Sequence, residues 1–294
     1  MSNFFLKDET DTNKQYPKIS IITPSFNQGQ YLEETILSVL NQNYPNFEYI
    51  IIDGGSTDNS LNIIKKYANR LTYWVSEPDN GMYHAIQKGF DKSSGEIMAW
   101  INSDDKYSDG AFSIVSQIFY DYKDIDWITS NPAHIDELSR IINTRGPRFW
   151  DKFDYALGNY KFIQQEGTFW RKTLWEKAGA YISQDYKLAS DMELWSRFFN
   201  ISLLYSVDAI LGLFRIRSEN QKSLDNYNEY LKEAELIANN YLPLNKKKFI
   251  LSIHKKATKK LIWRLYFNRY NKLRKKNNLI KIDRKSQKFI VSNS

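Results

Sequence analysis

Two adjacent carboxylates follow an apolar segment near the middle of this chain, and they are well suited to chemistry. Residues 97–101 predict a buried strand, and Asn102 and Ser103 lead directly into Asp104 and Asp105. Carboxylate oxygens suit Mg²⁺ or Mn²⁺, which usually bind one or two carboxylates together with substrate phosphates. Asn, Ser and Asp are also the usual residues of solvated turns, so this segment alone leaves a simple turn as the alternative.

Three more polar loops come from neighbouring strands in the same half of the chain. Short apolar strands are expected at 17–24, 47–53 and 71–75, with amphipathic helices between them. Strand–helix units at this interval predict an α/β fold with a mainly parallel central sheet and flanking helices. Ligands of such sheets bind outside the carboxyl ends of the strands. The polar residues expected at that edge are Pro24, Ser25, Asn27, Asp53, Asp79 and Asn80.

The loops exclude several kinds of nucleotide site. They contain no G-x-G-x-x-G fingerprint and no P-loop lysine motif, so neither a nicotinamide dehydrogenase nor a P-loop NTPase is favoured. The chain has no cysteine and three histidines, which excludes thiolate chemistry and disfavours a zinc site. Four gathered polar loops with several acids fit a nucleotide diphosphate bound through a metal ion.

Two candidates for chemistry lie in the second half of the chain. Asp191 begins a helix whose inner face is apolar, and it could be an N-cap or a catalytic base. The two roles are compatible, because the helix dipole favours an ionised carboxylate at this position. Further on, Arg215, Arg217 and Lys222 are candidates for diphosphate contact, and an ordinary basic loop is the alternative.

Four motifs, in order, carry a family resemblance. They are Pro24-Ser-Phe-Asn27, Asp53-Gly-Gly-Ser-Thr-Asp58, Glu77-Pro-Asp-Asn-Gly81 and Asn102-Ser-Asp-Asp105. Over residues 17–215 the chain resembles glycosyltransferase family 2, whose members are inverting enzymes with the GT-A fold that use nucleotide-diphospho-sugars. The resemblance implies a Rossmann-like sheet, a nucleotide-sugar donor and an Mn²⁺ or Mg²⁺ cofactor.

The resemblance also implies roles for individual residues. Asp53 would contact the nucleobase, Pro24 and Asn27 would line the nucleotide pocket, and Asp104 and Asp105 would contact ribose and metal. Many members have an acid where this chain has Asn102, so Asp105 is expected to be the direct metal ligand. Asp191 would be the base, because relatives place theirs in a similar Asp-x-x-Leu-Trp context. The other residues expected at the nucleotide are Ser25, Asp79, Asn80, Asn102, Arg215 and Lys222.

The charge of the chain is divided unevenly. The net charge is +7, but residues 245–294 contain 17 Lys or Arg and one acid, whereas the remainder has 24 bases and 33 acids. Helical spacing of apolar residues in this tail predicts a basic amphipathic helix, of the type that binds anionic membrane surfaces through residues 246–288. A helix packed on the catalytic domain is the alternative.

These expectations define four segments and a function. The segments are a flexible leader (1–16), a nucleotide-sugar-binding half (17–110), a catalytic and acceptor-binding half (111–223) and a basic helical extension (224–294). The expected function is metal-dependent inverting transfer from a UDP-sugar to a saccharide or lipid-linked saccharide acceptor, in bacterial surface polysaccharide synthesis. No apolar run approaches 18 residues, so we expect no membrane-spanning helix. We expect a cytoplasmic protein that is peripheral on the inner face of the membrane. We expect no binding of nucleic acid, because the chain outside the basic tail is net acidic. A sugar-nucleotide pyrophosphorylase and a non-catalytic basic scaffold are the alternatives.

Overall fold

The structure is a computed structural model, and it describes residues 16–150, 163–218, 226–241 and 278–292. Lys222 lies outside the described residues, as does most of the basic stretch 246–288.

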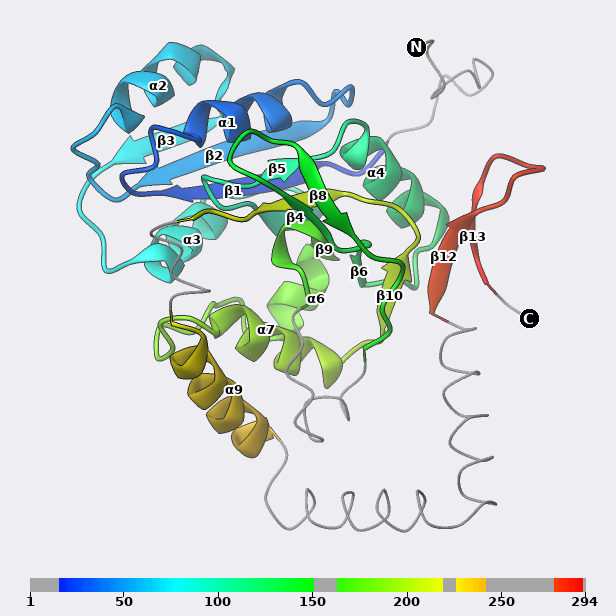
Figure 1. Cartoon of the computed structure of the whole chain (residues 1–294). Coiled ribbons are helices and arrows are strands. Elements are labelled where there is room, and N and C mark those ends of the chain that lie inside the picture. The colour runs from blue at the N-terminus through cyan, green and yellow to red at the C-terminus, as the bar shows by residue number, and fades with distance from the viewer. Residues whose placement is uncertain (1–15, 151–162, 219–225, 242–277, 293–294) are drawn as a thin grey trace.

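A nine-stranded sheet forms the centre of the molecule (Figure 1). Its strand order is β13-β12-β10-β6-β9-β4-β1-β2-β3. Only β9 and β13 pair antiparallel with their neighbours, which confirms a mainly parallel sheet. The strands are β1 (Ile19–Ser25), β2 (Phe47–Asp53), β3 (Tyr73–Ser76), β4 (Ile97–Trp100), β6 (Trp127–Thr129), β9 (Thr168–Arg171), β10 (Leu204–Val207), β12 (Leu279–Ile282) and β13 (Phe289–Val291).

Helices cover both faces of this sheet. In Figure 1, α1 and α2 lie on one side of β1 and β2, and α3 lies on the other. α1 buries Leu32, Ile36, Val39 and Leu40, the face that its apolar spacing predicts. The helices are α1 (Leu32–Leu40), α2 (Ser60–Tyr67), α3 (Met82–Asp91), α4 (Ala111–Asp121), α6 (Lys172–Lys177), α7 (Ser190–Phe199) and α9 (Tyr227–Tyr241), with short 3₁₀ helices η1 (Ala68–Arg70) and η2 (Gln165–Gly167).

A smaller sheet lies beside the carboxyl end of β4. Its order is β5-β11-β7-β8, formed by β5 (Lys106–Tyr107), β11 (Gly212–Arg215), β7 (Ala133–Ile135) and β8 (Ile141–Thr144). β5 directly follows Asp104 and Asp105 in the chain and pairs antiparallel with β11. This pairing brings the segment around Arg215 next to the two carboxylates.

The large aromatic side chains of the second half are mainly core. Trp100 and Trp195 stack with their ring centroids 5.8 Å apart, and Trp170 packs edge-on against both. Trp170 and Trp195 are fully buried, and Trp150 is nearly so. Of the two roles that the sequence leaves open for these tryptophans, sugar stacking and core packing, the structure supports core packing.

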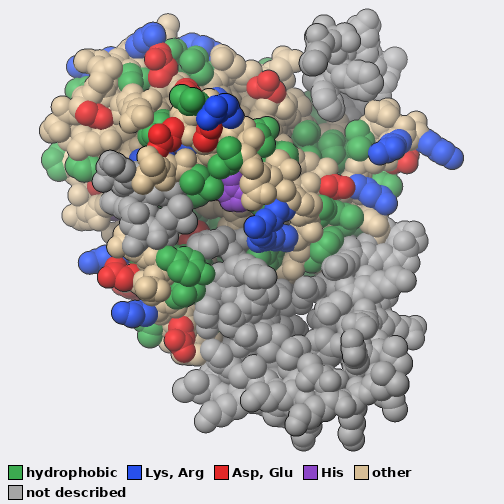
Figure 2. All heavy atoms as spheres, viewed as in Figure 1, with side chains coloured by type: hydrophobic (Ala, Val, Ile, Leu, Met, Phe, Trp, Pro, Cys, Tyr) green, Lys and Arg blue, Asp and Glu red, His purple; other side chains and the backbone are tan. Residues whose placement is uncertain are grey.

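The end of the chain was predicted to be helical, but it forms two strands. α9 fits the predicted extension, but residues 279–282 and 289–291 form β12 and β13 at the edge of the central sheet. In β12 Ile280 lies in the core, Leu279 is half-buried, and Lys281 and Ile282 are exposed. The turn between the strands carries Lys and Arg side chains on a protruding hairpin (Figure 2). Among the described residues, no helix has the length and apolar character needed to cross a bilayer.

Candidate active site

The loops after β1 and β2 are tied together at the carboxyl edge of the sheet. The register of the two strands places Ser25 beside Asp53. Asn27 has a left-handed φ of 51°, and its side-chain Oδ1 accepts the Thr57 N–H at 2.9 Å. The Asp53 carboxylate is buried and accepts the backbone N–H of Ser56 at 2.9 Å. Asn27 and Asp53 therefore shape one polar rim.

The loop after β3 joins this rim. A Cβ atom on Gly54 would lie 2.9 Å from Oδ2 of Asp79, so the two loops approach closely at this point. Asp79 Oδ1 accepts the Gly81 N–H at 2.7 Å, and Asn80 is exposed beside it. The structure thus brings Asp53, Asp79 and Asn80 together at one edge of the sheet.

Asp104 and Asp105 differ in what surrounds them. Asp105 is 1% exposed, and its two oxygens accept the Arg215 backbone N–H at 2.8 Å and the Asn102 amide at 3.2 Å. Asp104 is only half-buried, and its Oδ2 lies 3.0 Å from Nη2 of Arg217. Burial raises the pKa of both carboxyls. Asp104 therefore faces the site, whereas Asp105 points into the protein.

The two arginines of the predicted basic loop also differ. Arg215 is fully buried, donates to the Asp104 carbonyl oxygen at 2.7 Å and pairs with Glu34 at 2.8 Å. The expectation that Arg215 contacts a diphosphate is therefore not supported, because its guanidinium holds β11, α1 and the β4 loop together. Arg217 is the arginine that faces the site.

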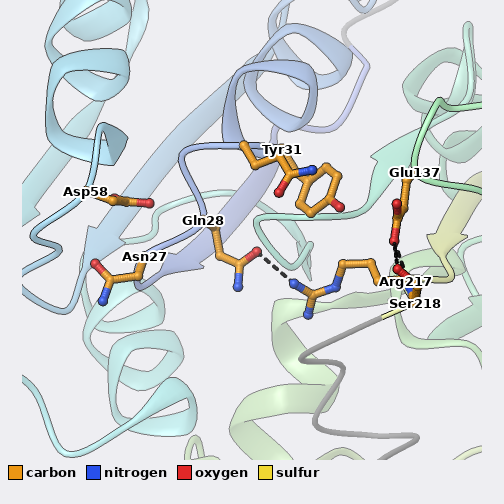
Figure 3. A pocket seen from close by; sticks show the side chains of 8 residues that line it. Asn27, Gln28, Tyr31, Asp58, Glu137, Arg217 and Ser218 are labelled. Carbon is orange, nitrogen blue, oxygen red and sulfur yellow. Dashed lines mark hydrogen bonds between the residues drawn. The ribbon is translucent and has the colours of Figure 1, made fainter.

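A cavity of about 490 Å³ opens beside Arg217 (Figure 3). Gln28 and Arg217 meet across it at 3.2 Å, and Ser218 donates to Glu137 at its rim. The lining is almost wholly polar, which suits a charged or hydroxyl-rich ligand. Its residues are Asn27, Gln28, Gln30, Tyr31, Asp58, Glu137, Arg217 and Ser218.

Asp191 lies in the first turn of α7 but does not cap it in the way the sequence suggests. The residue before the helix is Ala189, and the hydroxyl of Ser190 donates back to the Tyr186 carbonyl. Glu233 on α9 accepts the backbone N–H groups of Lys187, Leu188 and Ala189, each at 2.9 Å. The carboxylate of Glu233 thus fixes the backbone that leads into α7. Asp191 accepts only the N–H of the next residue, Met192, at 2.8 Å.

The environment of Asp191 changes its acidity. Burial, with a smaller contribution from the charge of Glu233, raises the pKa of its carboxyl to about 6. A carboxylate with a pKa close to the working pH is a better proton acceptor than one with the usual value near 4. Among the described residues no lysine or arginine forms an ion pair with Asp191.

Glu233 makes a testable contribution to this geometry. We expect Glu233→Ala to destabilise the protein by about 1–3 kcal/mol, because three backbone N–H groups lose a charged acceptor. We also expect a lower turnover number with little change in donor affinity, because the backbone that positions Asp191 would no longer be fixed. The measurement is a melting curve together with steady-state kinetics. Glu235→Ala, an exposed acid on the same helix, is the control and should change neither.

Several buried polar atoms at this edge have no hydrogen-bond partner within the described part of the chain. They include Oγ of Ser25, Oδ1 of Asn102, Oε1 of Gln165 and Oε1 of Glu166. Ser25 ends β1, Asn102 follows β4 and Glu166 precedes β9, and these three strands are neighbours. An unsatisfied buried polar atom costs about 1–3 kcal/mol, so a row of them indicates a place where a polar ligand binds.

Glu166 is not among the site residues predicted above from the sequence. Glu166 lies just before β9. Because β9 runs antiparallel between β4 and β6, it starts at the edge of the sheet where those two strands end, and this places Glu166 at the site.

Comparison with known proteins supports the geometry. The sequence model described as "Glycosyl transferase family 2" matches residues 20–196, which is more than half of the chain and contains the rim, Asp104, Asp105, Glu166 and Asp191. The chain belongs to glycosyltransferase family 2. The GT-A fold and glycosyltransferase activity follow from this membership, and a pyrophosphorylase or a non-catalytic scaffold is not supported.

The sequences of relatives align with part of this family 2 glycosyltransferase. An uncharacterized glycosyltransferase of Mycobacterium tuberculosis (strain CDC 1551 / Oshkosh) is 30% identical over 179 residues, which is 60% of this chain and 67% of the relative. The putative teichuronic acid biosynthesis glycosyltransferase TuaG of Bacillus subtilis is 37% identical over 94 residues, 31% of this chain and 37% of TuaG.

Solved structures resemble this family 2 glycosyltransferase in fold. S. aureus TarS (residues 1–349), in complex with UDP-GlcNAc, aligns with a TM-score of 0.59 at 17% identity, over 76% of this chain and 70% of that one. The mannosyltransferase PcManGT from Pyrobaculum calidifontis, in complex with GDP-Man and Mn²⁺, aligns with a TM-score of 0.54 at 14% identity, over 86% and 83%.

Proposed function

We propose that this protein is a metal-dependent inverting glycosyltransferase that moves a sugar from a UDP-sugar to a saccharide or lipid-linked saccharide acceptor in bacterial surface polysaccharide synthesis. Family membership supports sugar transfer. The similarity to TuaG supports the polysaccharide context, and the TarS complex with UDP-GlcNAc supports UDP.

One observation carries the proposal. The charges of both Asp104 and Asp191 act on the buried carboxyl of Glu166. Asp104, at the end of β4, and Asp191, whose pKa is about 6, therefore both lie near Glu166 at the edge of the sheet. A donor diphosphate near Asp104 would then have its sugar directed toward Asp191.

The reaction follows from this arrangement. Asp191, when ionised, removes the proton from an acceptor hydroxyl as its oxygen attacks the anomeric carbon. The new glycosidic bond forms on the face opposite the departing nucleoside diphosphate, so the anomeric configuration inverts. The site residues orient the two substrates, which supplies much of the rate enhancement in such direct displacements.

The rim residues would hold the nucleotide. We assign the nucleobase to Asp53 and the adjoining loop around Asn27. Pro24 and Ser25 at the end of β1, Asp79, Asn80 and Asn102 complete the proposed pocket. Lys222, which lies outside the described residues, stays a candidate for diphosphate contact.

The carboxylates fit a weak Mg²⁺ or Mn²⁺ site. No group of three or more His, Cys, Asp or Glu residues that could hold a metal occurs in the described ranges. Such ions, however, commonly bind proteins through one or two carboxylates and complete their shell with phosphates and water. We propose Asp104 as the direct ligand and Asp105 as the residue that fixes the loop. When bound, the ion would neutralise charge on the departing diphosphate.

The pKa of Asp191 predicts how activity depends on pH. We expect the turnover number to fall about tenfold per pH unit below pH 6 and to be flat above pH 7, because only the ionised carboxylate accepts a proton. The measurement is the initial transfer rate at saturating donor between pH 4.5 and 8.5. A rate that stays constant down to pH 5 would contradict a base with this pKa.

The function is tested by a donor screen. The full chain is incubated with Mn²⁺ and with UDP-, GDP- and dTDP-sugars, and we measure the rise in melting temperature and the release of nucleoside diphosphate. We expect stabilisation and slow hydrolysis with a UDP-sugar. If none of these compounds is bound or hydrolysed, with Mn²⁺ or with Mg²⁺, the proposed function is wrong.

The basic tail is proposed to bind an anionic membrane surface. The described hairpin exposes Lys281, Arg284, Lys285 and Lys288, and each such charge contributes about 1 kcal/mol near an anionic surface. We expect the protein to sediment with phosphatidylglycerol vesicles at low salt but not at high salt, and replacement of these four residues by Gln to weaken binding at least tenfold. Equal binding to neutral phosphatidylcholine vesicles would contradict the proposal.

A further inference from the structure

Glu166 is held rigidly at the sheet edge. A Cβ atom on Gly212 would lie 2.3 Å from the Glu166 carbonyl oxygen, and one on Gly167 would lie 2.1 Å from Oγ of Ser130. Gly212 is therefore needed where η2 packs against β11, and Gly167 packs closely against the end of β6. The backbone at Glu166 is thus held between these two strands.

The side chain itself is buried but incompletely bonded. Glu166 is 2% exposed, and no described residue lies within hydrogen-bonding distance of its Oε1. Protein structures rarely leave such an atom unsatisfied unless a ligand, an ion or water reaches it. The unsatisfied Ser25 and Asn102 oxygens on the neighbouring strand ends show that this is not an isolated defect.

The surroundings of Glu166 are acidic. Burial raises the pKa of Glu166 to about 8, and the charges of Asp104 and Asp191 make smaller contributions in the same direction. At neutral pH the carboxyl is therefore mostly protonated, with one O–H to donate and one oxygen to accept. A neutral carboxyl of this kind suits a hydroxyl group better than it suits a metal ion or a phosphate.

We propose that Glu166 holds the transferred sugar, exchanging hydrogen bonds between its carboxyl and a ring hydroxyl of the donor, in the space between Asp104 and Asp191. This inference rests on the proposed function. It makes Glu166 a specificity-determining residue: nucleotide contacts on the other strand ends would bind any donor of the same base, whereas Glu166 would bind the sugar alone.

The test separates sugar binding from nucleotide binding. Dissociation constants with Mn²⁺ are measured by calorimetry for UDP, UDP-glucose, UDP-N-acetylglucosamine, GDP and GDP-mannose, on the full chain and on Glu166→Ala and Glu166→Gln. The readout is the affinity for each sugar nucleotide relative to its parent nucleotide. Glu176→Ala, an exposed acid on α6, is the matched control.

We expect Glu166→Ala to weaken the best-bound sugar nucleotide about tenfold while its parent nucleotide changes less than twofold, because one buried hydrogen-bonding group is lost. Glu166→Gln, which keeps a donor and an acceptor in the same shape, should recover most of that loss. Melting curves establish that both variants are folded.

Two results would overturn the proposal. If the relative affinity of the sugar nucleotide is unchanged in the folded variants, Glu166 does not contact the sugar. If nucleotide and sugar nucleotide weaken equally, Glu166 only supports the site. A wild-type protein that binds neither nucleotides nor sugar nucleotides is a different outcome, because it would refute the proposed function itself.

Discussion

Replacing Asp191 by Asn should reduce sugar transfer by roughly 10²–10⁴-fold, the usual contribution of general acid–base catalysis. Asn has the size of Asp and can still accept the Met192 N–H, but it cannot take a proton from the acceptor. Donor affinity should stay near wild type, because the nucleotide contacts lie on other elements. The measurement is the initial rate at saturating donor, with calorimetry for donor binding.

The same variant should be more stable than wild type at pH 7. The pKa of Asp191 is about 6 in the folded chain and near 4 when unfolded, so its ionisation costs folding free energy that is fully present above pH 6 and absent below about pH 4. Asn removes that cost, so we expect a gain of roughly 3 kcal/mol at pH 7 and none at pH 4. The carboxylate that we propose as the base would then be a source of instability.

Asp185→Asn is the matched control for Asp191→Asn. Asp185 is an exposed acid just before α7, and the same chemical change there should leave rate and stability within error. An Asp191→Asn enzyme with nearly full activity would refute the base assignment. A large loss in Asp185→Asn, with Asp191→Asn active, would identify Asp185 as the base instead.

Replacing Asp104 by Asn should remove the effect of Mn²⁺ on nucleotide binding. We expect Mn²⁺ to raise UDP affinity in wild type, and that gain to fall 10–100-fold in Asp104→Asn, as is usual when a metal site is weakened. UDP binding with EDTA should be similar in both proteins, because the rim contacts remain. Calorimetric titrations with Mn²⁺ and with EDTA measure both quantities without requiring an acceptor.

Asp105→Asn distinguishes the proposal from the sequence-based expectation. Because Asp105 is buried and its carboxylate faces the Arg215 N–H rather than the site, the Mn²⁺ effect on UDP affinity should persist in a folded Asp105→Asn protein. If Asp105 is instead the direct ligand, a folded Asp105→Asn protein should lose the Mn²⁺ effect and Asp104→Asn should keep it.

The first half of the fold was predictable because its signals are local. Apolar runs ending in Pro24, Asp53 and Asp105 predict strands that finish in polar loops, and helical spacing predicts the faces that α1 and α2 bury. Parallel pairing then requires the loops to gather at one edge, so Asn27, Asp53 and Asp79 could be grouped before any coordinates were known.

The rest depended on contacts between distant parts of the chain. The different surroundings of Asp104 and Asp105 arise from the segment around β11, about 110 residues later in the chain. The Arg215 backbone N–H donates to Asp105, and the guanidinium of Arg217, just after β11, pairs with Asp104. Glu233, on a helix that follows α7, holds the backbone before α7, and no local pattern indicates this. The segments of β12 and β13 were predicted to be helical because segments rich in Lys and Arg fit both states. The pairing of β12 with β10 and of β13 with β12 decides between them.

Proton NMR of donor turnover tests the central claim, direct displacement at the anomeric carbon assisted by Asp191, with the fewest assumptions. The full chain is incubated with Mn²⁺ and the α-linked UDP-sugar that it hydrolyses fastest, water serves as acceptor, and the anomer of the released sugar is followed before it mutarotates. We predict that the β anomer appears first, and that Asp191→Asn slows its release at least 100-fold. Initial release of the α anomer, or release of the β anomer at an unchanged rate by Asp191→Asn, would contradict the mechanism.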